Sequence, residues 1–465
     1  MTGDLRVHEA DLLRELRRIE VRTPFVEALA QRTRGAVASA DSKSRTARNS
    51  PHLEGVAFRA WKGTRWVESA TFGLGKDNLA RAADDLLSRL ASHDSSEGPP
   101  GAATATTGVF DRPVPRPMRD LGNEGALSWA QQVLSWTREE PDIKFAQATV
   151  QWSEDERYYL NSTGANCVQR LARVMASILA VAAENGRSEF YADAVGRLGG
   201  QEVLVALPEA KVRKVCAAAR ALLRAKAPPR GPMNVLLDPG VTGTFVHESF
   251  GHGTEADQFV RNRSYLQPLL GTMVGPEFLT LVDDGSIPDG WGSIRFDDEG
   301  HLSQRTPLVQ DGRFVGALHD RSTAAALGAH PTGNTRRANF LGQAFVRMTN
   351  TLVEPRDLSY DELIEEARNG IVLERWLSGI EDPLGGRMQI KTRQGHLIEN
   401  GKVTDLVSSV VLSGRVLEFL RDIRGVGSAE PLDLTPASCG KGHSDLLPVG
   451  SGGPYLLSRA VVGPS

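Results

Sequence analysis

The feature that most constrains this chain is a pair of histidines in the run His-Glu-Ser-Phe-Gly-His, residues 247 to 252. Two imidazoles beside a carboxylate can hold a zinc ion, but the usual zinc-hydrolase motif has one residue fewer between its histidines. At about 100° per residue, the usual spacing keeps both histidines on one face of an α-helix, whereas the spacing here would separate them by about 140°. The run therefore predicts a π-type turn or a helix end near Gly251, where glycine would tolerate the required backbone angles. The alternative is two surface or capping histidines beside an ordinary helical Glu248.

A hydrolytic zinc site needs a third ligand, and the best candidate among three cysteines is Cys439. Cys167 and Cys216 lie in apolar stretches, where a buried thiol behaves as a small hydrophobic side chain. Cys439 lies in a small-residue loop, and the neighbouring Lys441 and His443 would favour its thiolate form, which is the form that binds metals. On chemistry alone, Cys439 is either a zinc ligand or a free loop thiol in a reducing compartment.

Several distinctive sequence blocks follow one another along the chain. They are His-Glu-Ser-Phe-Gly-His-Gly-Thr-Glu-Ala-Asp (247 to 257), Val-Asp-Asp-Gly-Ser-Ile-Pro (282 to 288), Pro-Thr-Gly-Asn-Thr-Arg-Arg (331 to 337), Leu-Ile-Glu-Asn-Gly-Lys-Val (397 to 403) and Cys-Gly-Lys-Gly-His (439 to 443). In this order they resemble the TldD/PmbA family, the "modulator of DNA gyrase" peptidases. The resemblance covers essentially all of residues 232 to 465 and is weaker upstream.

The resemblance implies a metallopeptidase with zinc on His247, His252 and Cys439, and with Glu248 as general base. It also implies a dimer, of identical or related chains, whose enclosed cavity admits small or extended peptide substrates. Because all four residues are present, the chain looks like the catalytic branch of the family. Two alternatives remain: a non-catalytic subunit of a heterodimeric peptidase, and a hydrolase of an amide-linked small metabolite. His443 departs from the residue expected at its position, so its contact with metal or substrate is left open.

Arg336 and Arg337 are candidate substrate-binding residues, because a guanidinium can grip a peptide carboxylate or carbonyl. The alternative for this pair is a solvated loop.

Composition agrees with an ordinary globular protein. Hydrophobic residues make up 40% and charged residues 24% of the 465 residues, and the net charge of −3 gives no electrostatic reason to expect nucleic-acid binding. The first residues show no apolar signal core, and the longest apolar stretch, 175 to 183, is too short to span a bilayer. We therefore expect a cytoplasmic protein without nucleic-acid or membrane partners.

The expected fold is α+β with two domains, because the chain is too long for one compact core. Residues 1 to 230 would form an N-terminal α/β domain with a low-complexity loop at about 92 to 118, and residues 231 to 465 a β-rich domain carrying the metal site. The expected helices are Asp11 to Thr33, Asp77 to Ala91, Ala126 to Arg138 and Glu209 to Ala225, with a hairpin over Val56 to Phe72, paired strands over Phe145 to Trp152 and Arg157 to Ser162, and a strand or helix over Val168 to Asn185.

Overall fold

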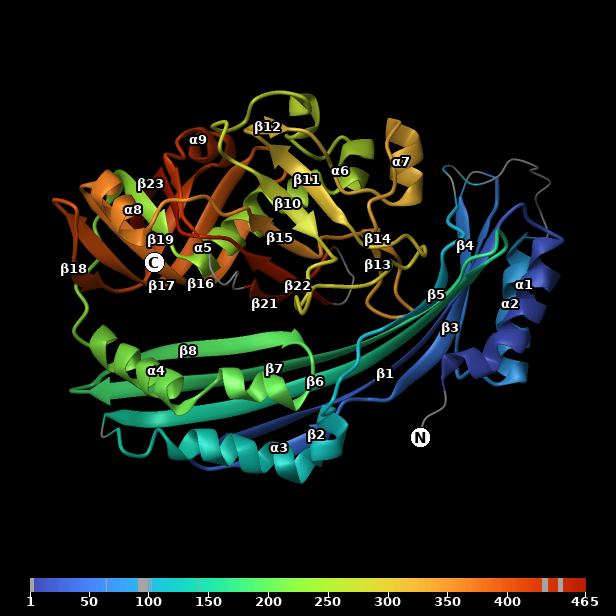
Figure 1. Cartoon of the computed structure of the whole chain (residues 1–465), viewed down its shortest axis with the longest axis horizontal. Coiled ribbons are helices and arrows are strands. Elements are labelled where there is room, and N and C mark those ends of the chain that lie inside the picture. Colours follow the sequence, from blue (N-terminus) through green and yellow to red (C-terminus); the bar gives the residue numbers. More distant parts are fainter. Residues whose placement is uncertain are drawn as a thin grey trace.

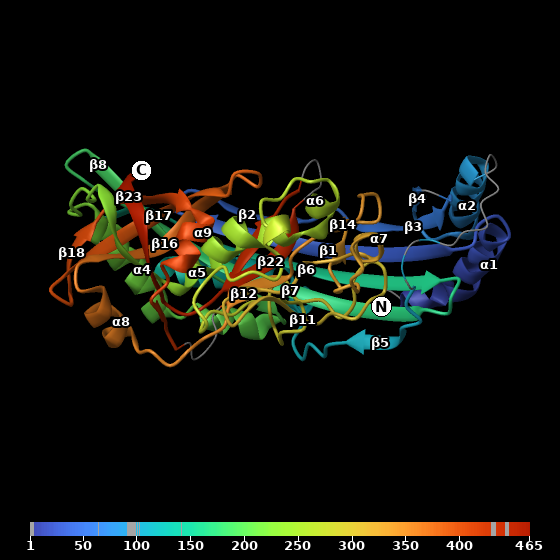
Figure 2. The same cartoon turned by 90° about the horizontal axis from the view of Figure 1, so that it is seen from above.

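The computed structural model confirms a mixed α and β fold (Figure 1). It describes residues 4–63, 65–90, 99, 101, 103–140, 142–428, 434–441 and 446–465. A long curved sheet from the N-terminal half lies beneath a more irregular C-terminal part, and Figure 2 shows the two stacked, with α1 and α2 at the far end of the sheet.

The N-terminal sheet is built from long antiparallel strands with one parallel edge strand. Its order is β4-β3-β1-β6-β7-β5, with β2 on β1 and β8 on β7. The strands are β1 (Val26–Asp41), β2 (Arg45–Asn49), β3 (Leu53–Trp61), β4 (Trp66–Phe72), β5 (Thr107–Asp111), β6 (Ile143–Asn161), β7 (Asn166–Glu184) and β8 (Arg187–Leu198).

Two pairs of helices cover this sheet. Helices α1 (Glu9–Glu20) and α2 (Lys76–Leu90) pack at one end, and α3 (Met118–Ser135) and α4 (Glu209–Leu222) at the other. Each pair buries its apolar stripe against apolar residues of the strands, such as Ala30 and Phe58 at one end and Val150 and Val174 at the other.

Three sequence expectations need correction here. The helix expected over Asp11 to Thr33 ends at Glu20, and residues 26 to 33 belong to strand β1. The two strands expected between Phe145 and Ser162 are the single strand β6. Part of the expected loop at 92 to 118 forms β5, which pairs parallel with β7, while residues 91–98, 100 and 102 lie outside the described residues. The ambiguous segment after Val168 is strand β7, and the hairpin and the helices α2 and α4 are confirmed.

The C-terminal part contains two larger sheets. One has the order β16-β9-β23-β19-β17-β18 with β20 on β23, and the other the order β12-β11-β10-β15-β22-β21. The first comprises β9 (Gly231–Leu237), β16 (Gly370–Glu381), β17 (Arg387–Glu399), β18 (Lys402–Val407), β19 (Val410–Arg415), β20 (Gly425–Val426) and β23 (Leu456–Pro464). The second comprises β10 (Leu281–Asp284), β11 (Arg305–Gln310), β12 (Arg313–Phe314), β15 (Asn350–Val353), β21 (Leu434–Cys439) and β22 (Leu447–Gly452).

Short helices and a small strand pair complete this part. They are α5 (Pro239–Thr244), α6 (Ala256–Val260), α7 (Arg321–Leu327), α8 (Tyr360–Ala367) and α9 (Val416–Arg421), with β13 (Thr335–Arg336) against β14 (Phe345–Val346). No described helix is long and apolar enough to cross a membrane.

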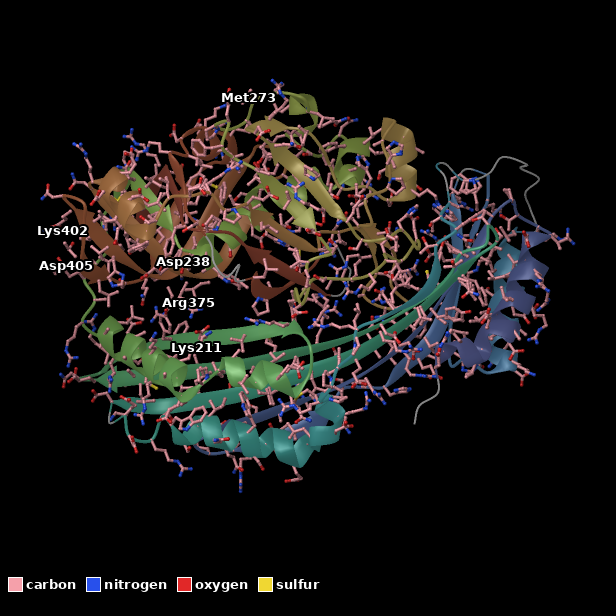
Figure 3. The ribbon with its side chains drawn as sticks, in the orientation of Figure 1. Lys211, Asp238, Met273, Arg375, Lys402 and Asp405 are labelled. Carbon is pink, nitrogen blue, oxygen red and sulfur yellow. The ribbon has the colours of Figure 1, made fainter. Side chains whose placement is uncertain are left out.

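Charged side chains join the N-terminal sheet to the C-terminal part. Figure 3 shows Lys211 on α4 and Arg375 on β16 at this boundary, and both lie beside the carboxylate of Asp193 on β8, at 3.3 and 2.6 Å. Farther along, Arg59 of β3 donates to Glu299 at 2.6 Å, in a fully buried pair. Such pairs hold the two parts in position, because separating the parts would leave buried charges without a partner.

Candidate metal centre

His247 lies in a π-helix, Phe245–Gly251, that is continuous with α5, and His252 is the residue directly after it. The backbone N–H of His252 donates to the carbonyl oxygen of His247, which is the i→i+5 bonding of a wider turn. The expected helix distortion is therefore confirmed. The reason given for Gly251 was wrong, because its φ and ψ of −57° and −51° are ordinary helical values.

Position 251 requires glycine because there is no space for a side chain. A Cβ at this position would lie 2.2 Å from the sulfur of Met348, a side chain that is itself buried. Phe245, Val246 and Phe250 of the same segment are also completely buried, so the π-helix is fixed in the core of the C-terminal part. A side chain at residue 251 would push the helix away from its neighbours.

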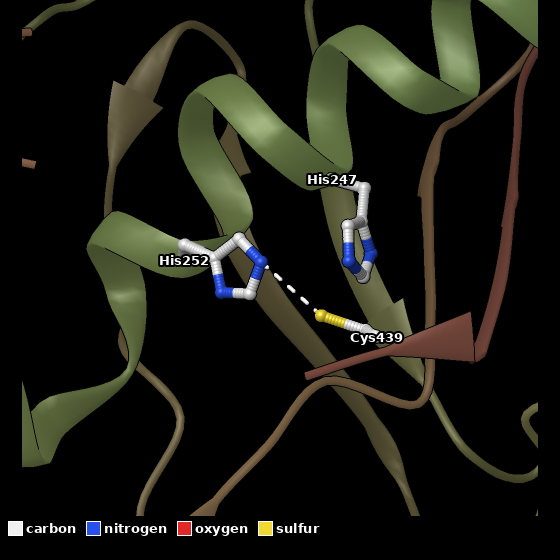
Figure 4. Close-up of side chains that lie close together, drawn as sticks. All are labelled: His247, His252 and Cys439. Atoms are coloured by element: carbon white, nitrogen blue, oxygen red, sulfur yellow. Dashed lines mark hydrogen bonds between the residues drawn. The ribbon is translucent and has the colours of Figure 1, made fainter. Parts of the chain in front are cut away.

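The structure brings His247, His252 and Cys439 together (Figure 4). One donor atom from each lies within 4.8 Å of the others, and Cys439 Sγ is 3.2 Å from His252 Nε2. The two imidazole centroids are 5.1 Å apart. Among the described residues, these three form the group of histidine, cysteine or carboxylate side chains whose ligand atoms lie close enough together to hold one metal ion.

Cys439 reaches the histidines from the end of β21 and is only 7% exposed, so it lies in a strand and not in the small-residue loop that the sequence predicted. Strand β21 pairs with β22, and β22 runs parallel to β15. Arg347, just before β15, donates from Nη2 to the carbonyl oxygen of Cys439 at 2.7 Å. Long-range strand pairing therefore places the third donor.

The environment of Cys439 favours its thiolate. Burial raises the pKa of this thiol, but hydrogen bonds and charge from His247 and His252 outweigh burial and lower the pKa to about 5. A thiolate with two imidazoles is a donor set that zinc accepts, and its three members leave a coordination position open for water or substrate. The residues present therefore fit a catalytic zinc ion.

A buried carboxylate, Glu255, lies behind this donor set. Its Oε2 is 3.5 Å from His252 Nδ1 and 2.8 Å from Lys441 Nζ, and Arg347 Nε lies 3.6 Å from Oε1. Burial raises the pKa of Glu255, but the charge of Lys441 and the contact with His252 outweigh it and lower the pKa to about 2. Glu255 thus contacts both His252 and the two cationic residues near Cys439, Lys441 and Arg347.

The sequence contained Glu255 and Lys441 in its motif blocks but gave no role to the glutamate. A carboxylate that orients a ligating imidazole is a recurring outer partner in metal sites, so the spacing His252-x-x-Glu255 was a usable signal.

Glu248 is placed where a proton acceptor is useful. Its Oε2 lies 3.9 Å from His252 Nε2, and its side chain is 31% exposed. Burial raises the pKa of Glu248. The carboxylate stem packs on Gly379 of β16, where a Cβ would lie 2.5 Å from Glu248 Cγ. Any side chain at residue 379 would displace the glutamate.

A further carboxyl, the partly buried Glu381 at the end of β16, lies near His252 and was missed by the sequence analysis. A Cβ on Gly253 would lie 3.6 Å from its Oε1. Burial raises the pKa of Glu381 to about 8. No sequence signal marks this residue, because its place near the site depends on strand β16 packing beside the π-helix.

Arg336 and Arg337, the two candidate substrate residues, are almost completely buried. Arg336 donates to the carbonyl oxygens of Met348 and Pro448 at 2.6 and 2.8 Å, and Arg337 donates to Glu68 at 3.2 Å. These bonds within the chain disfavour a substrate role, which stays an untested prediction. His443 lies outside the described residues.

Comparison with known proteins identifies the family. Residues 230–462 match the description "PmbA/TldA metallopeptidase C-terminal domain", and residues 116–227 match the central domain of the same family. The chain belongs to the TldD/PmbA family. A metalloprotease of Archaeoglobus fulgidus is 33% identical over 86% of this chain and 92% of its own length. A metalloprotease of Methanothermobacter thermautotrophicus is 39% identical over 67% of this chain and 68% of its own length. As a member of this metallopeptidase family, the protein is a hydrolase.

Two further matches bear on cofactor and fold. A Saccharolobus solfataricus relative described as a zinc metalloprotease TldD homologue is 29% identical over 50% of this chain and 52% of its own length. The structure of a putative modulator of DNA gyrase from Thermotoga maritima has a TM-score of 0.80 at 19% identity and covers 98% of this chain and 100% of that one. The structure of TldE from Thermococcus kodakarensis has a TM-score of 0.75 at 18% identity and covers 97% of this chain and 100% of that one. At these identities the two structures show a shared TldD/PmbA fold.

Proposed function

We propose that this TldD/PmbA metallopeptidase is a zinc-dependent peptidase that uses His247, His252 and Cys439 as ligands. The observation that carries the proposal is the convergence of two imidazoles and a low-pKa thiol within 4.8 Å, with Glu248 beside them. The zinc-metalloprotease description of the Saccharolobus relative supports zinc as the metal.

When bound, zinc would supply a positive charge that polarises the scissile carbonyl and makes a water molecule more acidic. Glu248 accepts a proton from that water and returns it to the nitrogen of the leaving amine. Glu255 holds His252 through Nδ1, which leaves Nε2 of the same ring facing Cys439. Gly379 gives the Glu248 side chain its room.

The substrates we propose are short or unfolded peptides in an enclosed cavity formed with a second chain. That chain is a second copy or a related TldD/PmbA protein, a pairing suggested by the shared fold with the separately described TldE. The chemistry also suits an amide-linked metabolite, and the assay below uses peptides because relatives are described as metalloproteases.

The test is metal content and hydrolysis measured on the same preparations. Elemental analysis of the isolated chain should give zinc in the wild type and much less in Cys439→Ser, while Cys216→Ser serves as the matched control. Cys216 is a buried thiol on α4, packed in the N-terminal core, so its loss should leave the zinc content unchanged.

Hydrolysis of a casein-derived peptide mixture should stop when a chelator removes the metal and return when zinc is restored. Native mass spectrometry of the complex from its own source identifies the second chain. A wild-type protein that hydrolyses the mixture equally well with and without bound metal would overturn the proposal.

A further inference from the structure

Glu381 carries chemistry that the proposed mechanism does not use. Its side chain is partly buried at the end of β16, and its Oε1 is fully buried without a hydrogen-bond donor from the described residues. A buried carboxyl oxygen without a hydrogen-bond partner is costly, and a substrate group that donates to it would remove that cost.

The charges around Glu381 favour a cationic partner. The charged groups that act most strongly on it are the imidazole of His252 and the carboxyls of Glu248, Glu255 and Asp382. The cations Lys441 and Arg347 are engaged with Glu255. Glu381 is also not one of the three residues whose donor atoms converge. Three of the four charged groups that act on it are carboxyls, and a substrate ammonium would complement them.

Strand geometry relates Glu381 to the reacting bond. Gly379, Ile380 and Glu381 pair in regular register with Ile390, Gln389 and Met388 of β17. Gly379 and Glu381 therefore face the same side of β16, about 7 Å apart along the strand. Because Glu248 packs directly on Gly379, Glu381 lies roughly two extended residues from the general base.

We propose that Glu381 binds the free α-amino group of the substrate, so that the enzyme releases one or two residues from a peptide N-terminus. The proposal rests on the proposed function, since it assigns a substrate end to the same site. An extended peptide advances about 3.3 Å per residue, so an ammonium at Glu381 would place the first or second peptide bond near Glu248.

The test compares two peptides of the same sequence, one with a free N-terminus and one with an acetylated N-terminus. The zinc-loaded wild type should cleave the free peptide with a kcat/KM at least about tenfold higher, and mass spectrometry should find one- or two-residue products. In Glu381→Gln this preference should disappear because only the value for the free peptide falls. The matched control is Asp382→Asn, which removes the adjacent, more exposed carboxylate and should keep the preference.

Two measurements distinguish ammonium binding by Glu381 from a general role of this residue at the site. Zinc content should be the same in wild type and Glu381→Gln, and a lower content would overturn the proposal by placing the carboxylate on the metal. A Glu381→Gln variant that loses activity equally on both peptides would overturn it as well.

A binding measurement separates this proposal from the proposed function. Calorimetry on zinc-loaded Glu248→Gln would compare alanylalanine amide with its N-acetyl form. Tighter binding of the free amine, lost on adding Glu381→Gln, supports ammonium recognition even if the wild type hydrolyses neither peptide. Equal binding of the two forms overturns the proposal even if zinc-dependent hydrolysis is found.

Discussion

The two segments that supply the candidate ligands are held in different ways. His247 lies in a π-helix and His252 caps it, so the i→i+5 hydrogen bond between their backbones sets their spacing, and apolar residues of that helix fill the core. Cys439 comes from the end of β21, far along the chain, and is held by strand pairing and by Arg347. One half of the site is thus local and apolar, whereas the other half is long-range and held by charges.

The two halves of the site are therefore vulnerable to different changes. Changes in the helix should act through packing, and changes around Cys439 should act through charge. Glu255 is the residue at which the two meet, because it touches His252 on one side and Lys441 on the other. The predictions below separate chemistry, charge and packing on this basis.

The largest effect is expected from Glu248→Gln, which changes chemistry while leaving both halves in place. Glutamine keeps the size of the side chain against Gly379 but cannot accept the proton of water. The rate of peptide hydrolysis should fall by about 10²- to 10⁴-fold, the usual contribution of a general base. Zinc content, measured on the same sample, should not change. Full activity in a zinc-loaded variant would exclude Glu248 from proton transfer.

Glu255→Gln tests the charged link between the halves. Glutamine fills the same space but loses the charge that faces Lys441 and Arg347, and it orients His252 less strongly. Zinc affinity should fall about 10- to 100-fold, as for other outer carboxylates that orient a ligating histidine. Competition with a chromophoric chelator measures the affinity.

Asp257→Asn is the control for this prediction. Asp257 also pairs with Lys441, at 2.6 Å, but no contact between its side chain and His252 is found in the described part of the chain. The control should lose much less affinity. Equal losses in the two variants would mean that Lys441, and not the orientation of His252, controls the metal.

Packing at the helix is tested by Gly251→Ala. The new Cβ would meet the Met348 sulfur at 2.2 Å, so the free energy of unfolding should fall by about 1 to 3 kcal/mol, as for other overpacked cores. Combining it with Met348→Ala should recover part of that loss, because the double variant removes the clash. Denaturant unfolding of the wild type, the two single variants and the double variant gives a double-mutant cycle. Strictly additive losses would show that the clash is not the cause.

The local half of the site could be predicted from the sequence because helix angles depend only on residue spacing. The sequence spacing of His247 and His252 was enough to predict a π-type turn or a helix end near Gly251, and the structure has the π-helix. The backbone role of Gly251 was misjudged because the sulfur that excludes a side chain belongs to Met348, almost a hundred positions away. Glu381 could not be found either, since its burial beside the histidines is a product of tertiary packing.

The errors in the fold have the same origin. The Ala- and Leu-containing start of β1 has a good helical propensity, but pairing with both β3 and β6 overrides it. The acidic run in β6 resembled a turn between two strands. In the structure Glu154 and Glu156 lie opposite Arg34 and Arg32 of β1, so cross-strand pairs accommodate the charges within one strand.

The smallest expected effect is a difference in local stability when the metal is removed. Amide hydrogen exchange, followed by mass spectrometry with and without a chelator, should speed up more in residues 434 to 441 than in residues 245 to 252. The π-helix keeps its own hydrogen bonds and its buried phenylalanines without metal, whereas the end of β21 loses the attraction between its thiolate and the shared ion. Lys441→Met should enlarge the difference, because it removes a second charge that holds the same segment to Glu255 and Asp257. Equal acceleration in the two segments would mean that the metal stabilises the site as one unit, and the contrast between a self-supporting helix and a charge-held strand end would then be wrong.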